Sequence, residues 1–140
     1  MVDKCTVSAY LKRLFPICRS LTCEGNRKTL EILREIVAID VREMPSDTIV
    51  YDWKVPQEWH IKDAWIKDSL GNKIVNFKEN NLHVVSHSTG IDCEITFKAL
   101  EKRLYCHPYL EDAVPYRTSY YQRDWGFCVS QKQLEKLRKA

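Results

Sequence analysis

The sequence lacks the features that mark membrane and exported proteins. No apolar run approaches the roughly 18 residues that a membrane-spanning helix needs. The N-terminus has no apolar core of the kind found in a signal peptide. With four glycines and five prolines among 140 residues, the composition is that of an ordinary globular chain. These absences predict a cytoplasmic protein without a membrane partner.

The sequence also has little excess of charge of either sign. Its 22 Lys and Arg residues and 19 Asp and Glu residues leave a net charge of +3. The two signs are interspersed along the chain instead of gathering into blocks. Proteins that bind nucleic acid through phosphate contacts generally present a strongly basic surface. We therefore expect no nucleic-acid partner for this segment.

The usual signatures of nucleotide-binding and hydrolase sites are missing as well. The sequence contains no GxGxxG segment, no Walker loop and no GxSxG elbow. Six cysteines are present, but none of their spacings is CxxC. In a reducing compartment we expect free and mostly buried thiols, with a redox role or a metal site as the alternatives.

The sequence does have two aromatic runs, residues 52–66 and 116–130, which together hold all four tryptophans. Large rings bury about 150–250 Å² each and dominate the core or interface that they enter. Pro56 fixes its own φ and pushes Val55 toward an extended conformation, so the first run predicts the entry to a strand. We expect the two runs to pair or pack together and to close a compact β-rich unit.

Two helices are predicted before the first aromatic run. A short helix within residues 5–18 should end at Pro16, and a longer amphipathic helix should follow over residues 27–41. Two helices of this size cannot bury the apolar face of the second one unaided, so another element must cover it. The side chains of that face are Leu30, Leu33, Val37 and Val41, widened by Ile32 and Ile36.

From Thr48 onward, short apolar runs alternate with turns, as is typical of β-rich units. Thr96 is expected to cap a helix over residues 97–105, and Ser130 a terminal helix over residues 131–140. The predicted fold class is α+β, with N-terminal helices, a compact sandwich- or barrel-like β-rich domain and a C-terminal helix. The predicted strands are residues 48–53, 60–67, 73–77, 82–88, 116–121 and 126–130.

The histidine motifs favour a structural role over a chemical one. His83 and His87 have the spacing of a zinc pair on a helix. The valines between them favour a strand, on which the two Cα atoms would lie about 13 Å apart. Cys106-His107-Pro108 lies in a predicted loop without a second ligand at a useful spacing. We therefore assign no metal ligand and no catalytic residue in this chain.

The acidic side chains give no specific signal for acid–base catalysis. Asp52, Glu58, Asp63 and Asp68 each have Lys or Arg within a few residues. Such carboxylates usually belong to a solvated, charge-balanced surface. We predict that role for all four.

One segment is a candidate ligand or partner surface. Arg117, Tyr120, Tyr121, Arg123 and Trp125 interleave basic and aromatic side chains, as surfaces that stack ligands do. Packing of the same rings in a core or an interface is the alternative.

Three segments of the sequence resemble a microbial zinc aminopeptidase-like family. Members of this family resemble the two-zinc aminopeptidases, and a β-rich domain of unknown function is inserted early in their peptidase domain. A winged-helix domain often follows at their C-terminus. The resembling segments are LFPICRSLTCEGNRKTLEIL, PSDTIVYDWKVPQEWHIKDAWIKDSLGNKIVNFKENNLHVVSHS and VPYRTSYYQRDWGFCVSQ, within a stretch from about Tyr10 to Gln133.

The resemblance implies a division into three parts. Residues 1–45 would open a peptidase-like domain, residues 46–130 would form the inserted β-rich domain, and residues 131–140 would lead back to the peptidase domain. The zinc ligands of the family lie in a CHPS-type strand end, in a following N-D-N segment and later still, all of which would come after Ala140. Zinc is therefore expected in full-length members, whereas no cofactor is expected in this chain.

The sequence departs from the family pattern at a few positions. Cys23 and Asp47 stand where the family commonly has glycine, and Gln131 stands where a histidine is usual. A residue with a Cβ is disfavoured at positive φ, so the two glycine replacements predict strained turns. The run from Cys106 to Pro108 imitates the CHPS-type motif but lies where the family has a variable loop.

The sequence thus predicts the N-terminal fragment of a zinc aminopeptidase-like protein, which lacks the metal site and is inactive alone. Its partner would be the rest of the peptidase domain, or further copies in a homo-oligomer. The alternative is a stand-alone β-rich module that binds or oligomerises through its aromatic and basic face. An exposed apolar face on the helix at residues 27–41 would favour the fragment, because a self-sufficient module would cover that face.

Overall fold

The computed structural model describes residues 4–140, which form four short α-helices, one 3-10 helix and six strands of two to four residues. They divide into two compact units, unit 1 (Met1–Ile61) and unit 2 (Lys62–Ala140). This mixture of helices and antiparallel hairpins confirms the predicted α+β class. Among the described residues, no helix combines the length and the apolar character needed to cross a membrane.

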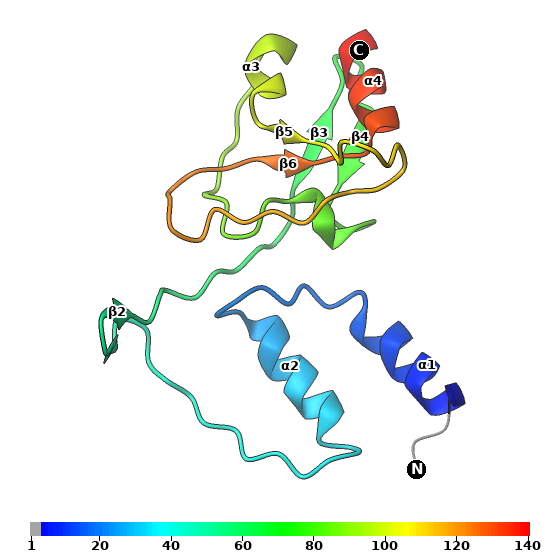
Figure 1. Ribbon diagram of the computed structural model, residues 1–140. Coiled ribbons are helices and arrows are strands. Elements are labelled where there is room, and N and C mark those ends of the chain that lie inside the picture. The colour runs from blue at the N-terminus through cyan, green and yellow to red at the C-terminus, as the bar shows by residue number, and fades with distance from the viewer. Residues whose placement is uncertain (1–3) are drawn as a thin grey trace. The chain divides into compact units, whose positions relative to one another are not determined.

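Unit 1 contains two helices, α1 (Lys4–Leu14) and α2 (Glu24–Leu33), shown in blue in Figure 1. α1 ends before Pro16, as predicted, because proline cannot continue a helix. The Arg13 guanidinium donates to both carboxylate oxygens of Glu35, at 2.6 and 2.7 Å. Exposed charged groups therefore link the end of α1 to the residues that follow α2.

The helix predicted over residues 27–41 is only partly correct. α2 begins three residues earlier and ends at Leu33. Beyond it Ile36, Val37 and Ile39 lie close together, and β-branched side chains lose χ1 freedom in a helix. No residue of α2 is buried, and Val37 is 56% exposed. Within the described residues the predicted apolar face is therefore only partly covered: Ile36 and Val37 are exposed, and its other members are half-buried.

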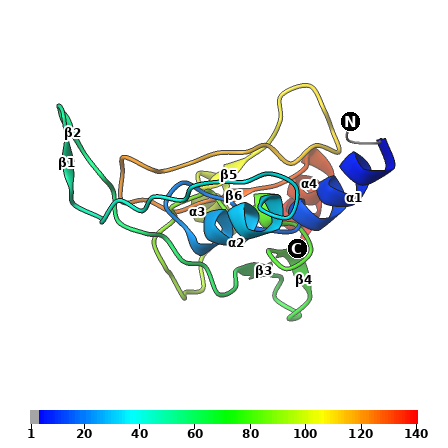
Figure 2. The ribbon, with the colours of Figure 1, turned by 90° about the horizontal axis from the view of Figure 1, so that it is seen from below.

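A two-residue turn converts the strand predicted over residues 48–53 into a hairpin. β1 (Ile49–Val50) and β2 (Trp53–Lys54) pair antiparallel. In the turn between them Tyr51 has a φ of 52° and is 97% exposed. Figure 1 and Figure 2 both show this hairpin standing apart from α1 and α2.

Asp47 and Cys23, which stand where the family commonly has glycine, differ in their backbone φ angles. Asp47 has a φ of 69°, in the region that favours glycine, and its carboxylate accepts from the Lys54 ammonium at 2.7 Å. Cys23 has an extended backbone with a φ of −135°, and a positive φ of 54° falls on Thr22 instead. The strain predicted from the glycine replacements is therefore found at Asp47 and not at Cys23.

Unit 2 begins with a hairpin of β3 (Trp65–Lys67) and β4 (Lys73–Asn76), as the sequence predicts. Asp68 closes its turn, because the Asp68 carboxylate accepts from two backbone N–H groups of the turn at 3.0 and 2.8 Å. Gly71 supplies the φ of 85° that the same turn requires.

The later part of unit 2 differs from the prediction, since the helix predicted over residues 97–105 ends at Glu101 and a strand follows it, while the remaining strands are shorter than predicted. β5 (Leu104–Tyr105) and β6 (Phe127–Cys128) form a parallel pair. β5 follows α3 (Phe97–Glu101), a short helix that Thr96 caps as predicted. Residues 82–88 and 116–121 contribute isolated bridges instead of strands, Val84 to Phe127 and Ser86 to Thr118, after the 3-10 helix η1 (Asn81–His83).

The C-terminal helix α4 (Gln131–Lys139) begins where predicted, after Ser130. The Ser130 hydroxyl accepts from the Gln133 backbone N–H at 3.2 Å, and the Gln133 side chain accepts from the Ser130 backbone N–H at 3.0 Å. These two bonds complete a capping box. Leu137 is buried, and α4 lies against β4.

The core of unit 2 lies among these elements, with Val75, Cys128 and Val129 fully buried. Within the described residues the strands form three separate two-stranded sheets, so the predicted sandwich or barrel is not formed. Strands of two to four residues are too short to build such an architecture. The two aromatic runs also do not pair with each other, because β3 pairs with β4 and β6 with β5.

Candidate functional site

The residues predicted to form an aromatic and basic surface lie in unit 2, in the segment that leads into β6. The Arg117 guanidinium lies over the Tyr105 ring, 4.1 Å from the ring centroid. The Trp125 ring receives the Arg103 guanidinium at 5.3 Å and meets the Phe127 ring at 6.4 Å. Arg117 and Trp125 therefore both make ring contacts within the fold.

Tyr120, Tyr121 and Arg123 are the other members of this surface. The rings of Tyr120 and Tyr121 meet edge to face at 4.7 Å, and the Tyr120 ring also meets the His87 ring at 5.0 Å. Burial raises the pKa of the Tyr120 hydroxyl, whereas Tyr121 is 92% exposed and Arg123 is exposed too. Tyr121, Arg123 and Arg117 are the exposed members, and ligand binding through this surface stays a prediction.

His83 is a structural residue of unit 2. Its Nδ1 lies 2.8 Å from the Cys128 carbonyl oxygen, which can only accept, so Nδ1 carries the proton. Its Nε2 then accepts from the side-chain amide of Gln133 at 3.3 Å. Both ring nitrogens are thereby used within the fold, and the imidazole joins η1 to β6 and to the cap of α4.

His87 and His107 also contribute to local structure. The His87 Nδ1 lies 3.0 Å from the Ser86 hydroxyl, and the His107 Nδ1 accepts from two following backbone N–H groups at 3.2 and 3.1 Å. Across the part of the chain that the structure describes, no three His, Cys, Asp or Glu side chains gather closely enough to hold a metal ion. These residues do not fit the zinc site that the resemblance implies for the family.

Two of the four carboxylates singled out from the sequence, Glu58 and Asp63, lie in charged surface contacts. Asp63 accepts from the Lys78 ammonium at 3.1 Å, which lowers the pKa of Asp63. The Arg27 guanidinium bonds to Glu58 and lowers the pKa of that carboxyl. Both groups are therefore ionised partners of a neighbouring cation near neutral pH.

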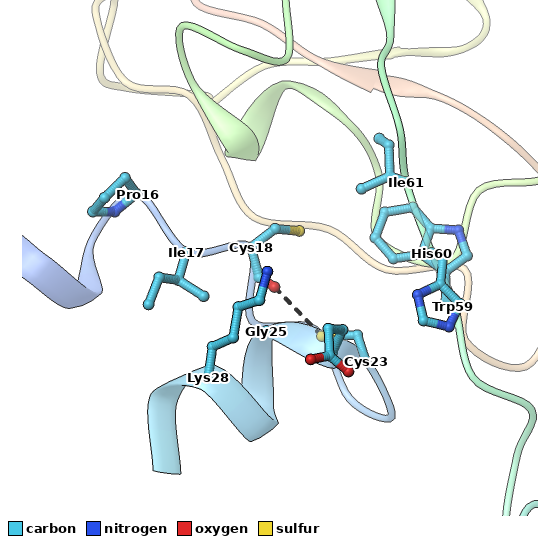
Figure 3. A pocket seen from close by; sticks show the side chains of 10 residues that line it. Pro16, Ile17, Cys18, Cys23, Gly25, Lys28, Trp59, His60 and Ile61 are labelled. Carbon is cyan, nitrogen blue, oxygen red and sulfur yellow. Dashed lines mark hydrogen bonds between the residues drawn. The ribbon is translucent and has the colours of Figure 1, made fainter. Parts of the chain in front are cut away.

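A cleft that the sequence analysis did not predict lies at the start of α2. It has a volume of about 370 Å³ and belongs wholly to unit 1. Residues 16–18, residues 23–25 with Lys28, and residues 59–61 line it, as Figure 3 shows. Since Gly25 has no side chain, the first turn of α2 presents its backbone to the cleft.

The loop that leads into α2 is shaped by Cys23 and Gly25. The Ser20 N–H donates to the Cys23 sulfur at 3.1 Å, and the Cys23 thiol donates to the Ser20 carbonyl oxygen at 2.9 Å. A Cβ on Gly25 would overlap the carbonyl oxygen of Cys18. Only glycine therefore allows α2 to start this close to the preceding loop.

Hydrogen bonds fix the segment that forms the facing wall. The Trp59 backbone N–H donates to the Thr22 carbonyl oxygen at 3.1 Å, and the Thr22 hydroxyl donates to the Gln57 carbonyl oxygen at 3.1 Å. The bond between Arg27 and Glu58 adds a tie from α2 to the same segment. These hydrogen bonds join the two walls of the cleft, the start of α2 and residues 57–59, to each other.

The cleft offers apolar surface and charge to a ligand. Ile17, Trp59 and Ile61 supply the apolar surface, while Glu24 and Lys28 supply one charge of each sign. Burial raises the pKa of the Cys18 thiol, so this thiol stays protonated near neutral pH and is a poor nucleophile. The lining therefore suits reversible binding more than covalent chemistry.

Known proteins resemble nearly the whole of this chain. A curated protein of Clostridium acetobutylicum is 45% identical to it over 127 residues, which are 91% of this chain and 29% of that protein. Its name describes it, provisionally, as a polysaccharide biosynthesis protein with an aminopeptidase-like domain. The chain spans less than a third of this relative, which confirms the predicted resemblance to part of an aminopeptidase-like protein.

A solved structure gives the same result. The crystal structure of a protein from Clostridium acetobutylicum that is provisionally named a peptidase matches with a TM-score of 0.89 at 43% identity. The match covers 93% of this chain and 31% of that one. Residues 58–140 also match the model of a family described as a domain of unknown function, DUF2172. Because that match covers more than half of the sequence, the chain belongs to the DUF2172 family.

Proposed function

We propose that this chain is the N-terminal portion of a zinc aminopeptidase-like protein and does not hydrolyse peptides by itself. In this proposal residues 1–45 open the peptidase domain and residues 46–130 form a domain inserted into it. The names of the relatives and the small share of their length that the chain covers support the assignment. The zinc ligands would come from the remainder of the longer protein, which we place in the cytoplasm.

The observation that carries the proposal is the uncovered apolar surface of unit 1. α2 has no buried residue, although its sequence is amphipathic. A large contiguous patch of apolar side chains at the surface often marks a site where another part of a protein packs, whereas single exposed ones do not. In unit 1 the exposed ones include Val7, Leu11, Phe15, Leu21, Ile36 and Val37, between 45% and 72% exposed.

In the longer protein, the remainder of the peptidase-like domain would cover this surface. Burial of apolar area contributes roughly 25 cal/mol per Å², so a cover over several large side chains would stabilise unit 1 by several kcal/mol. Residues 1–45 would then act as a part of the peptidase domain and not as a domain of their own.

An activity assay tests the catalytic half of the proposal. The chain and the full-length Clostridium acetobutylicum relative are incubated with leucine p-nitroanilide, each with and without added zinc. We expect no hydrolysis by the chain under either condition. Zinc-dependent hydrolysis by the purified chain, abolished by a chelator, would overturn the proposal.

A reconstitution experiment tests the structural half. The chain is mixed with the relative from which the homologous N-terminal part has been deleted. We expect a complex on size exclusion and a loss of binding of an apolar dye such as ANS to the chain. If the chain alone binds no more dye than a stable globular domain does, the uncovered surface is not accessible in solution and the proposal fails.

The second candidate is a stand-alone module that self-associates through the aromatic and basic face. The observation that favours it is that unit 2 closes a core of its own and leaves Tyr121 and Arg123 exposed. Sedimentation of the chain should then show a concentration-dependent oligomer that Tyr121→Ala with Arg123→Ala disperses. A monomer at all concentrations, or an oligomer unaffected by the double variant, would contradict this candidate.

A further inference from the structure

The cleft at the start of α2 holds two opposite charges that do not pair with each other. Glu24 and Lys28 both line it and lie four residues apart on α2, a spacing at which such side chains often form an ion pair. Here the Glu24 carboxylate accepts from Arg27 at 3.2 Å instead. Among the described residues, no carboxylate lies within 4.0 Å of the Lys28 ammonium.

The bond to Arg27 does not neutralise the acidic side of the cleft. The single guanidinium of Arg27 is shared by Glu24, Glu43 and Glu58. Three carboxylates around one guanidinium leave an excess of negative charge and unused acceptor positions on Glu24. The cleft therefore presents a carboxylate with spare acceptor capacity and, one helical turn away, an ammonium with spare donors.

Apolar side chains stand opposite these charges. In Figure 3, Trp59 and Ile61 come from one wall, while Ile17 comes from the loop before α2. The backbone bonds of Trp59 and Gln57 to Thr22 hold this wall in place. A wall held by bonds within the protein reduces the cost of ordering the site when a ligand binds.

We propose that this cleft binds a free α-amino acid with an apolar side chain. The ammonium group of the ligand would bind the Glu24 carboxylate, its carboxylate would bind the Lys28 ammonium, and its side chain would pack against Trp59 and Ile61. A purely cationic ligand would leave the Lys28 ammonium without a partner, and a purely anionic ligand would leave the excess negative charge around Arg27 uncompensated. The volume of about 370 Å³ is in the range of small-molecule sites. The inference is independent of the proposed function.

Ligand analogues test each part of the proposal on the 140-residue chain. Leucine is titrated into ¹⁵N-labelled protein, with the Gly25 amide and the Trp59 indole N–H as reporters. Leucinamide lacks the carboxylate, N-acetyl-leucine lacks the ammonium, and glycine lacks the apolar side chain. We expect saturable shifts with leucine and binding at least about tenfold weaker for each analogue, because each loses one charged bond or the apolar contact.

Matched variants test the assignment of the two charges. Lys28→Gln should weaken leucine binding about tenfold and bring it close to that of leucinamide, which has no carboxylate for Lys28 to bind, while the preference for leucine over N-acetyl-leucine stays. Glu24→Gln should likewise bring leucine binding close to that of N-acetyl-leucine, which has no ammonium, while the preference for leucine over leucinamide stays. Lys12→Gln, an exposed lysine of α1 that does not line the cleft, should leave the affinity unchanged. Unchanged binding in both cleft variants, or an equal loss in the Lys12 variant, would overturn the proposal.

Thiol protection gives a second readout that needs no resonance assignment. Cys18 lines the cleft, whereas Cys93 is exposed elsewhere in the chain. Leucine should slow the alkylation of Cys18 by iodoacetamide several-fold and leave the rate at Cys93 unchanged. If neither the alkylation rate nor the Gly25 resonance responds to leucine at about 20 mM, a concentration well above a millimolar Kd, the cleft does not bind amino acids.

Discussion

The two units of the molecule differ most in how much apolar surface they bury. Of the eleven buried apolar side chains in the described part of the chain, nine belong to unit 2 and two, Leu14 and Cys23, to unit 1. Val75, Cys128 and Val129 are fully buried in unit 2, whereas α2 buries no residue. Unit 2 therefore has an apolar core of its own, and unit 1 is held mainly by hydrogen bonds and ion pairs.

The two units are thus stabilised by different interactions, unit 2 by apolar burial and unit 1 by polar contacts at the surface. Burying one large aliphatic side chain contributes about 1.5–3 kcal/mol, whereas an exposed ion pair contributes about 0–1 kcal/mol. Unit 2 should therefore be the more stable of the two. Unit 1 should depend on tight local geometry and should gain most from a covering partner.

The largest effect is expected in unit 1, from Gly25→Ala. The added Cβ would overlap the Cys18 carbonyl oxygen, so the backbone of the loop or of α2 must move. Overpacking against a backbone atom should cost about 3 kcal/mol and should abolish the cleft. Hydrogen exchange should show lost protection in α2 and unchanged protection in unit 2.

Gly90→Ala is the matched control for this change. No atom lies within 4 Å of a Cβ built on Gly90, and its φ does not lie in the positive region. We expect a change of less than about 0.5 kcal/mol. If Gly25→Ala removed protection from unit 2 to the same extent as from unit 1, the contrast between the units would be wrong.

The next largest effect is expected in the core of unit 2, from Val75→Ala. Val75 is fully buried, so truncation removes two buried methyl groups and leaves a cavity. We expect the free energy of unfolding of unit 2 to fall by about 2.5 kcal/mol in urea titrations. Val37→Ala is the control in unit 1, where the side chain is 56% exposed and the expected loss is under about 0.5 kcal/mol. Similar losses for both variants would show that unit 1 buries Val37 in solution.

The stability of unit 2 should also depend on pH. Burial raises the pKa of the Cys128 thiol from 9.0 to about 11. The folded state thus holds this proton more tightly than the unfolded state does, so the contribution to stability is complete below pH 9 and is lost as the pH rises toward 11. The expected loss in unit 2 is on the order of 2 kcal/mol, measured by urea unfolding at pH 8 and at pH 11.

Two cysteine variants identify the source of that loss. Cys128→Ala removes this thiol and should reduce the pH dependence of unit 2, to which Cys106 and Tyr120 also contribute, although it lowers the stability at pH 8. Cys93→Ala removes an exposed thiol and should leave the pH dependence as it is. An unchanged slope in the Cys128 variant would assign the alkaline loss to other groups.

Local signals in the sequence were enough to predict much of the fold. Pro16 ends α1, Thr96 and Ser130 cap their helices, and the turn with Gly71 joins β3 to β4. Each of these features depends on residues within a few positions of each other, for which the backbone preferences are known. The sequence therefore predicted the class and several boundaries.

Features that depend on distant parts of the chain could not be predicted in the same way. The parallel pairing of β5 with β6 joins residues more than twenty positions apart, and nothing local specifies it. The cleft likewise depends on Thr22 bonding to Gln57 and Trp59. For the aromatic and basic surface, the sequence could not distinguish Tyr121 from Arg117. The difference depends on Tyr105, whose ring lies under the Arg117 guanidinium through a tertiary contact.

The smallest change in stability is expected from the N-cap residues, which differ between the helices of the two units. Ser130 caps α4 through a full capping box, whereas the residue at the same place on α2, Cys23, makes no side-chain cap bond. Ser130→Ala should destabilise unit 2 by about 1 kcal/mol, because the Gln133 N–H loses its acceptor. Ser130→Thr keeps an acceptor oxygen and should cost less than half as much. Urea unfolding with a probe in unit 2 measures both. Equal losses for the two variants would mean that Leu137, and not the cap, fixes the start of α4.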